Sequence, residues 1–317
     1  ARRLLVIYGD RDPGDVIHKM NTRKDKYDIS GKVHIREGEE KSHAMMEDYE
    51  GVIIWDLPSQ IRNKYLKYCF SHSIRCYMSP KISDIILLGT DRIHLFDTPL
   101  LMCRNQGLSM EQRAAKRLLD IVVSGLGIIV SSPIMLIIAI AVKAYDGGPV
   151  FYLQDRLTYR GKEFRIRKFR SMCVDSEKNG ARLASKHDSR ITPVGHVLRN
   201  LHLDELPQLF NVFAGDMSLV GPRPERDVIM QEYEQEIPEF HYRLKVKAGL
   251  TGYAQVYGKY NTTPYDKLKL DLFYIENYSF LLDIKLLFMT VKIFFQKEVS
   301  EGVDDDQKNA LKDSQDK

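Results

Sequence analysis

The sequence has few features of a disulfide-stabilised or zinc-binding protein. Only four cysteines occur in 317 residues, and they are scattered without a C-x-x-C pair or a histidine at ligand spacing. Neither a disulfide framework nor a zinc site is therefore expected, and free cysteines are typical of a reducing, cytosolic environment. The sequence has no internal repeat and no signal-peptide pattern. It begins with Ala1 and not Met, so we expect a fragment of a longer protein.

The chain also lacks a strong excess of charge. Its 47 lysines and arginines stand against 43 acids, a formal net charge of +4, which says little about partners. Basic residues cluster instead in residues 156–170, RLTYRGKEFRIRKFR. Such a cluster suits phosphates, anionic lipid headgroups or nucleic acid, and a solvated strand face is the alternative. With the features below, we expect phosphate and membrane partners and no nucleic acid.

The first hundred residues lack the glycine fingerprint of a dinucleotide-binding domain. Buried strands LLVIYG and GVIIWD alternate with helical segments PGDVIHKM and SQIRNKYLKYCFSHS, which predicts a parallel sheet flanked by helices. The first turn, YGDRDPGD, has no G-x-G-x-x-G, and Asp10, Arg11 and Asp12 would crowd a pyrophosphate. We therefore predict an α/β, Rossmann-like domain over residues 1–100 with a structural or regulatory role, followed by a linker over 101–115.

One apolar segment is too long for a soluble domain. Residues 118–142, LLDIVVSGLGIIVSSPIMLIIAIAV, would rise about 37 Å as a helix, enough to cross a bilayer. Pro133 lies near the middle, where it removes one helical hydrogen bond, and Ser131 and Ser132 can satisfy the freed carbonyls. The segment is therefore predicted to bend, as a helix, a break at Ser132 and Pro133, and a second helix.

Charges at the two ends of this segment favour a re-entrant hairpin. Lys116 and Arg117 flank one end and Lys143 flanks the other, so the positive-inside rule favours both ends on the cytoplasmic side. A kinked spanning helix and a buried core helix are the alternatives. A second apolar segment, SFLLDIKLLFMTVKIFFQK at residues 279–297, predicts either an interfacial helix or an ordinary packed amphipathic helix.

The stretch LDELPQ, residues 203–208, places two carboxylates side by side ahead of a proline. Apolar residues at helical spacing follow, and Gly215 offers a C-terminal stop, so Pro207 is expected in a first helical turn. Asp204 and Glu205 would then lie at the helix start, where free N–H groups and the helix dipole stabilise negative charge. Acids at this position often act only as caps.

Two arginines near this acidic pair favour phosphate chemistry. Arg199 precedes Asp204 by five residues, and Arg223 lies between Pro222 and Pro224. The prolines restrict the backbone, and an immobilised arginine suits bidentate phosphate recognition better than a mobile lysine. Acids, arginines and a nearby membrane segment together indicate phosphoryl chemistry on a substrate that is partly lipid.

Five motifs follow one another between residues 116 and 297: KRLLDIV, GPVFYLQDR, KFRSM, LDELPQLFNVFAGDMSLVGPRPE and GLTGYAQVYGK. In this order and spacing they resemble the bacterial sugar transferases, also called polyprenyl-phosphate phosphoglycosyl transferases, of the monotopic type. A resemblance that rests on several separated motifs is more specific than any single pattern. The N-terminal α/β domain is similar to the one found ahead of the catalytic module in larger members.

The resemblance implies an enzyme that transfers a sugar-1-phosphate from a UDP-sugar to undecaprenyl phosphate, releases UMP, and so initiates a capsule, O-antigen or exopolysaccharide repeat unit. It implies a mainly helical α+β transferase domain over residues 116–300, which includes the re-entrant hairpin 118–142 and precedes a polar tail at 301–317. The expected location is the cytoplasmic face of the bacterial inner membrane. The sugar could be galactose, glucose or an N-acetylated sugar, and homo-oligomerisation is left open.

The same resemblance implies roles for individual residues. Asp204 would attack the sugar-bearing phosphorus to give an aspartyl-phosphosugar intermediate, and Glu205 would help to hold Mg²⁺. Substrate or phosphate binding is assigned to Arg199, Arg223, Arg170 and Gln255, while Ser132 and Pro133 match the family's re-entrant break. Three positions depart from the family's usual Ser, Pro and Arg: His202, Ala248 and Lys259.

Two other classes of function compete with this one. A nucleotide-sugar oxidoreductase or epimerase would use the N-terminal sheet, but the missing glycine fingerprint argues against it. The non-enzymatic alternative is a membrane-peripheral assembly module in which LDELPQ is only a helix cap. An Asp204→Asn variant separates this non-enzymatic module from the sugar transferase, since a cap tolerates asparagine and a nucleophile does not.

Overall fold

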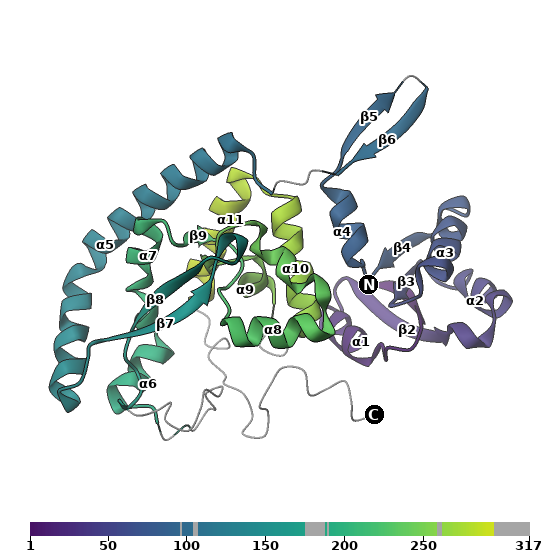
Figure 1. Cartoon of the computed structure of the whole chain (residues 1–317). Coiled ribbons are helices and arrows are strands. Elements are labelled where there is room, and N and C mark those ends of the chain that lie inside the picture. Colours follow the sequence, from purple (N-terminus) through teal and green to yellow (C-terminus); the bar gives the residue numbers. More distant parts are fainter. Residues whose placement is uncertain (96, 104–106, 175–187, 189, 259–261, 295–317) are drawn as a thin grey trace. The chain divides into compact units, whose positions relative to one another are not determined.

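The computed structural model describes residues 1–95, 97–103, 107–174, 188, 190–258 and 262–294. The chain divides into two compact units, Ala1–Lys81 and Ile82–Lys317 (Figure 1). The first unit ends about twenty residues before the boundary expected from the sequence. The expected polar tail, residues 301–317, and Lys259 lie outside the described residues.

The first unit is a parallel sheet with helices, as predicted. Its strands lie in the order β2-β1-β3-β4 and all pair in parallel. The apolar strands β1 and β3 are buried on both faces, which is typical of a parallel sheet covered by helices. The elements are β1 Arg2–Tyr8, α1 Gly14–Asn21, β2 Tyr27–His34, η1 Ile35–Glu37, α2 Glu39–Met46, β3 Gly51–Trp55, α3 Ser59–Ser71 and β4 Arg75–Met78.

The second unit is mainly helical, with short two-stranded sheets. It starts with α4 Ile82–Leu88, the hairpin β5 Asp91–Leu95 and β6 Thr98–Met102, α5 Met110–Asp146, and the hairpin β7 Phe151–Leu157 and β8 Glu163–Phe169 with η2 Tyr159–Gly161 between its strands. It continues with α6 Pro193–Asn200, η3 Leu203–Glu205, α7 Gln208–Ala214, β9 Ser218–Val220, α8 Asp227–Glu236, η4 Pro238–Lys245, β10 Gly249–Thr251, α9 Tyr253–Tyr257, α10 Pro264–Glu276 and α11 Phe280–Phe294. The hairpin β5–β6, which the sequence did not predict, occupies the end of the expected first domain and the start of the expected linker.

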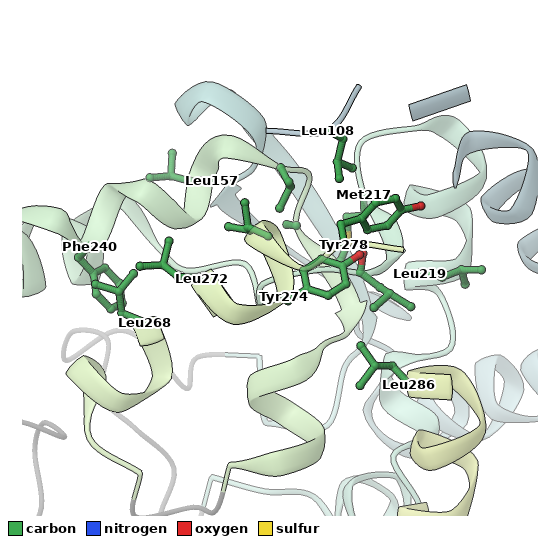
Figure 2. Close-up of a cluster of buried hydrophobic side chains, with 14 of the residues drawn as sticks. Leu108, Leu157, Met217, Leu219, Phe240, Leu268, Leu272, Tyr274, Tyr278 and Leu286 are labelled. Atoms are coloured by element: carbon green, nitrogen blue, oxygen red, sulfur yellow. The ribbon is translucent and has the colours of Figure 1, made fainter. Parts of the chain in front are cut away.

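The core of the second unit forms around α10 and the parallel pair β9–β10. Leu268 and Leu272 of α10 are buried with Met217 and Leu219 near β9, and Leu286 of α11 closes the cluster (Figure 2). Fully burying one such side chain stabilises a fold by about 1.5–3 kcal/mol. This core therefore holds β9 and the loop after it, which carries Arg223, in a fixed place.

Helix α5 runs without interruption through Pro133, so the expected break is wrong at the level of secondary structure. The missing N–H of Pro133 would have bonded the carbonyl of Ile129, and Ser132 Oγ donates to that carbonyl at 2.8 Å instead. Ser131 Oγ likewise donates to Gly127 O at 2.6 Å. The helix curves along its length in Figure 1. Ser132 thus satisfies the freed carbonyl as predicted, Ser131 bonds a carbonyl that Pro133 does not free, and the helix curves without ending.

Both ends of α5 are fixed to the rest of the second unit. At its N-terminal end, Lys116 Nζ lies 2.6 Å from Asp283 Oδ2 of α11, and Arg117 donates to Val212 O of α7 at 2.7 Å. At its C-terminal end, Asp146 forms a bidentate ion pair with Arg170. The basic residues at the first end therefore bind protein groups, whereas the flanking-charge interpretation counted them only as charges beside a membrane segment.

The exposed surface of α5 is strongly apolar. Among the described residues, α5 is the helix long and apolar enough to cross a membrane, and most of its apolar window is exposed. Helix α11 has a mixed environment: Leu286 is buried in the core, while Leu281 and Phe288 are 77% and 74% exposed. One face of α11 thus packs in the core while another presents apolar side chains to the exterior.

Candidate functional site

The acidic pair lies in a separate 3-10 turn ahead of helix α7. Asp204 and Glu205 belong to η3, and α7 begins only at Gln208. Pro207 has no N–H to continue the hydrogen bonding of η3, so it separates the turn from the helix. His202, just before the turn, has a left-handed backbone with φ 53°. The prediction that both acids start the helix is therefore wrong by one turn.

Apolar contacts hold this turn against a cluster that includes residues of helix α5. Leu203 and Leu206, on either side of the acids, pack on a buried cluster that includes Met135 and Ile138 of α5 and Phe169 of β8. Because interiors are close-packed, the side chains of such a cluster restrict one another's position. The acidic pair thus lies on an apolar cluster that the C-terminal half of α5 shares with β8 and α6.

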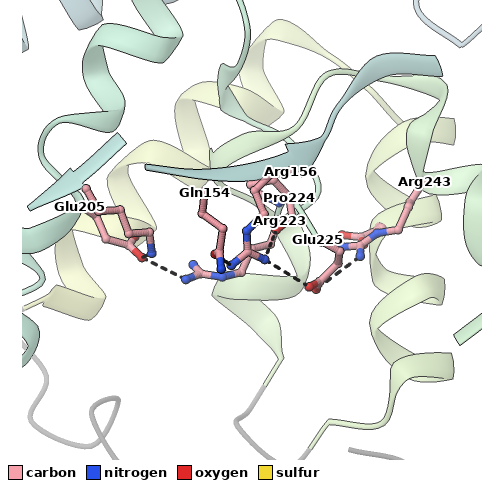
Figure 3. A network of polar contacts seen from close by, with 9 residues as sticks. Gln154, Arg156, Glu205, Arg223, Pro224, Glu225 and Arg243 are labelled. Atoms are coloured by element: carbon pink, nitrogen blue, oxygen red, sulfur yellow. Dashed lines mark hydrogen bonds and ion pairs between the residues drawn. The ribbon is translucent and has the colours of Figure 1, made fainter. Parts of the chain in front are cut away.

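Glu205 is held by two cations. Its Oε1 lies 2.6 Å from Lys168 Nζ and 3.0 Å from Arg223 Nη2, and Figure 3 shows the contact with Arg223. Burial would raise the pKa of Glu205, but Arg223 and Lys168 outweigh it and hold the pKa well below the usual range. Glu205 is consequently ionised at neutral pH and orients both cations.

Asp204 has a different electrostatic environment. It is 9% exposed, and burial, followed by the charge of Glu205, raises its pKa above the ordinary value. Lys168, Arg199 and His202 act in the opposite direction. Two adjacent carboxylates therefore differ in chemistry: one is fixed in ion pairs, and the other is a buried carboxylate with nearby but incomplete charge compensation.

Lys168 belongs to this site although the sequence did not single it out. The basic segment 156–170 forms the hairpin β7–β8, in which Arg165 and Arg167 are exposed while Ile166 and Lys168 lie on the inner face. Side chains alternate between the faces of a strand. The alternation in RIRK was thus the signal that could have identified Lys168. It places Arg165 and Arg167 on the solvated face and Lys168 on the inner face.

A small pocket adjoins Glu205 on the inner side of this hairpin. Its lining includes Arg156 of β7, Lys168 of β8, Gln208 of α7 and Arg223, together with Ile166, Pro224, Gly249 and Leu250. Arg156 is oriented by Gln154 Oε1 at 2.6 Å and by Pro224 O at 3.2 Å (Figure 3). The structure therefore brings three cationic side chains and one amide to a single pocket beside the acids.

The remaining predicted binding residues have other contacts. The Arg170 guanidinium pairs with Asp146 and donates from Nε to Pro149 O at 2.7 Å, which joins the end of α5 to β8. Gln255 Nε2 donates to the carbonyl of Leu250 at 3.1 Å. Arg199 lies close enough for its charge to lower the pKa of Asp204. Arg199 and Arg223 thus gather at the acids, whereas Arg170 is engaged at the base of the hairpin.

A buried charge network supports the segment that carries Arg223. Glu225 Oε1 lies 3.5 Å from Arg243 Nη1, and Arg243 Nη2 lies 2.8 Å from Asp271 Oδ2. Figure 3 shows Glu205, Arg223, Arg156, Glu225 and Arg243 in one row of polar contacts. Asp271 thus contributes by holding Arg243, which in turn holds the segment after Arg223.

Asp271→Ala is expected to lower the free energy of unfolding by about 3 kcal/mol, the lower end of the range for breaking a buried ion pair, because Arg243 loses its shorter ion pair and keeps only Glu225 at 3.5 Å. The two residues are 1% and 5% exposed. Denaturant unfolding of the purified protein in detergent measures the change. The control is Asp155→Ala, which breaks an ion pair with Arg165 whose side chains are 69% and 74% exposed; its cost should be below about 1 kcal/mol. Equal losses in the two variants would contradict this account of the network.

Comparison with known proteins agrees with these features. The chain is 44% identical over 180 residues to UDP-N-acetylgalactosamine-undecaprenyl-phosphate N-acetylgalactosaminephosphotransferase of Aeromonas hydrophila, covering 56% of this chain and 43% of the relative. It is 43% identical over 208 residues to UDP-glucose:undecaprenyl-phosphate glucose-1-phosphate transferase of Klebsiella pneumoniae, covering 64% and 43%. The undecaprenyl-phosphate galactose phosphotransferase of Salmonella typhimurium is 37% identical over 237 residues, covering 69% and 49%.

The chain thus spans about half the length of the curated relatives that it matches. One protein-family model matches a single segment of the chain. That family is described as bacterial sugar transferase, and it matches residues 111–297, more than half of the chain. This range contains α5 except its first residue, together with the acids, Lys168 and Arg223. The chain therefore belongs to the bacterial sugar transferase family.

Proposed function

We propose that this chain transfers a sugar-1-phosphate from a UDP-sugar to undecaprenyl phosphate and releases UMP. The observation that carries the proposal is the pair of adjacent carboxylates with opposite electrostatic environments, Asp204 and Glu205, beside Lys168 and Arg223. Relatives that share 37–44% of their aligned residues are named for this class of reaction, with different sugars. Both substrates carry phosphates, which suit a cationic pocket.

In the first step, a carboxylate oxygen of Asp204 attacks the phosphorus that bears the sugar. The new bond joins that oxygen to phosphorus, and the bond from phosphorus to the bridging diphosphate oxygen breaks, so UMP leaves with the electron pair. In the second step, an oxygen of the lipid phosphate attacks the same phosphorus, and the Asp204 carboxylate is released. Neither step needs a proton acceptor, since the attacking oxygens are already anionic.

Lys168 and Arg223 supply positive charge where the diphosphate accumulates negative charge. Glu205 keeps both cations in place, since each contacts its Oε1. Preorganised cations in a site of low dielectric stabilise a transition state more than mobile cations in water. Asp204 thus attacks the phosphorus, and Glu205 orients Lys168 and Arg223.

Magnesium fits this site as an ion shared with the substrate. The described residues contain no group of three or more His, Cys, Asp or Glu side chains arranged for a metal. Mg²⁺ commonly takes only one or two protein carboxylates together with substrate phosphates and water. Glu205, whose Oε1 contacts both cations, is the residue that would hold the ion, and bound Mg²⁺ would neutralise diphosphate charge.

The proposed location is the cytoplasmic face of the bacterial inner membrane, with α5 entering one leaflet. One module contacts α5 near both ends, through Lys116 and Arg117 at the first and Asp146 at the second. Ends that bind the same polar module lie on the same side of a bilayer, because polar domains do not cross it. The curvature of α5 and its exposed apolar face then favour a re-entrant helix over a spanning one.

UMP release by the purified chain in lipid nanodiscs tests the proposed reaction. With magnesium, a panel of UDP-sugars and undecaprenyl phosphate, we expect multiple turnovers only when both substrates are present, and transfer of labelled sugar into the lipid extract. The sugar that supports turnover identifies the donor. UMP formed without labelled lipid would indicate a hydrolase, and absence of UMP with every donor would contradict the proposal.

A further inference from the structure

We propose that the side-chain amide of Gln208 and the Nε of Arg156 bind the phosphate of the departing nucleoside monophosphate. This assignment rests on the proposed function, which supplies UMP as the leaving group. It makes the pocket beside Glu205 a leaving-phosphate pocket, distinct from the position of the sugar-bearing phosphorus next to Asp204. The residues that define the leaving-phosphate pocket are Arg156, Lys168, Gln208 and Arg223.

Two buried hydrogen-bond donors in this pocket have no partner among the described residues. Gln208 is 3% exposed, and across the residues that the structure describes its Nε2 forms no hydrogen bond. The Nε of Arg156 is also buried, and it likewise forms no hydrogen bond with the described residues. Buried donors without a partner are rare in proteins because their lost hydration is not replaced. Two of them that line one pocket indicate a ligand with acceptor oxygens.

The position of Arg156 is fixed by its other nitrogens. Nη2 donates to Gln154 Oε1 at 2.6 Å and Nη1 to Pro224 O at 3.2 Å. These contacts hold the plane of the guanidinium before any ligand arrives. Nε is therefore the nitrogen left for a ligand, and it is presented in a preset direction, which limits the entropy lost on binding.

The charge of the pocket selects an anion with several oxygens. Arg156, Lys168 and Arg223 are cationic, and the Gln208 amide adds a neutral donor. A cation or an apolar group would leave these donors unpaired, whereas a phosphate offers enough oxygens for several of them. Phosphate chemistry is therefore favoured over other small ligands.

The shared cations decide which phosphate is bound. Lys168 and Arg223 line the pocket and also contact Glu205, the neighbour of the attacking residue. They can thus lie between two phosphates of one diphosphate, with the attacked phosphorus toward Asp204 and the other phosphate in the pocket. The second phosphate belongs to the nucleoside monophosphate that leaves, and not to the lipid acceptor.

Gln208→Met tests this assignment, because methionine keeps the shape but cannot donate. In the full chain we expect UMP affinity, measured by isothermal titration calorimetry, to fall about 10- to 100-fold, the range for one hydrogen bond to a charged group. KM for the UDP-sugar should rise, while KM for polyprenyl phosphate should stay within about twofold. The matched control is Gln231→Met, at an exposed position of α8, and it should change none of these values.

Ligand-free stability distinguishes a binding role from a structural one. Removing an unpaired buried donor removes an unfavourable group, so the ligand-free melting temperature of Gln208→Met should equal or exceed that of the wild type. A second variant, Gln208→Glu, places a carboxylate among the three cations; it should raise the ligand-free melting temperature and abolish UMP binding.

The possible outcomes separate the two proposals. Failure of the wild-type protein to bind UMP would overturn the proposed function and this assignment with it. Normal UMP affinity in both Gln208 variants, with UMP bound by the wild type, would overturn the assignment alone. A lower ligand-free melting temperature in both variants would show a structural role, and a selective rise in KM for polyprenyl phosphate would place the lipid phosphate in this pocket; either result overturns the assignment.

Discussion

Asp204→Asn is expected to eliminate the covalent intermediate and to reduce turnover by about 10⁴-fold or more, as removal of a nucleophile does in other enzymes. The wild-type protein, incubated with UDP-sugar and without lipid, should gain the mass of one sugar phosphate in intact-protein mass spectrometry. The variant should gain none, because an amide does not attack phosphorus. Asp155→Asn on the exposed face of β7 is the matched control.

The same variant should be at least as stable as the wild type at neutral pH. Folding raises the pKa of Asp204, chiefly through burial, so the ionised carboxylate disfavours the folded state at pH values above both the folded and the unfolded pKa. Asparagine carries no charge and removes this effect. At pH values below the unfolded pKa the carboxyl is protonated in both states, and the difference from asparagine should shrink. Melting temperatures of the variant and the wild type, at neutral pH and below the unfolded pKa, measure this difference in stability.

Three results would contradict this reading of Asp204. An adduct of equal yield in Asp204→Asn would place the nucleophile elsewhere. Lipid-dependent UMP release by the wild type, with no adduct at any time, would indicate direct transfer between the substrates. A loss of activity accompanied by a lower melting temperature at neutral pH would assign Asp204 to structure, as the cap-only alternative requires.

Lys168→Met is expected to lower kcat/KM for the UDP-sugar by about 10²–10³-fold, the usual effect of removing one preorganised electrostatic group. It should also move the acid limb of the pH–activity profile to higher pH. Activity requires ionised Asp204, whose pKa is raised by burial and Glu205 and lowered by Lys168. Without Lys168 the pKa rises further, so activity is lost at a higher pH as the solution is acidified.

Arg167→Met is the control for Lys168→Met. Arg167 is the preceding residue of β8, and its side chain is exposed on the other face of the hairpin. We expect its kcat/KM within about twofold of the wild type and an unchanged acid limb. Equal losses for Arg167→Met and Lys168→Met would show that the total charge of the segment matters and not the inward lysine.

Local patterns predicted the fold and the acidic pair. Continuous apolar runs predicted the buried parallel strands β1 and β3, and Pro133 with its preceding serines predicted the bend and the freed carbonyl that Ser132 satisfies. These features depend on neighbours in the sequence, so periodicity and residue type were sufficient. Pro207 was misplaced because a 3-10 turn and the first turn of an α-helix have the same sequence signals.

Features that depend on distant residues were not predictable. Lys116 was read as a cation at a membrane interface, but it pairs with Asp283, 167 residues away. The roles of Lys168 and Gln208 depend on which face of a hairpin meets α7, and the role of Asp271 depends on Arg243. A single sequence gives the identity of such charges but not their partners.

The packing of Leu203 and Leu206 on the cluster that includes Met135 and Ile138 of α5 has a consequence for protein engineering. Truncation of α5 is the obvious route to a water-soluble fragment, but it would remove Met135 and Ile138 and expose the underside of the turn that carries Asp204. Loss of such contacts leaves cavities that cost several kcal/mol. A soluble fragment is better sought by replacing exposed apolar residues of α5, such as Ile129 and Val130, with polar ones, since those side chains do not pack beneath the acidic turn.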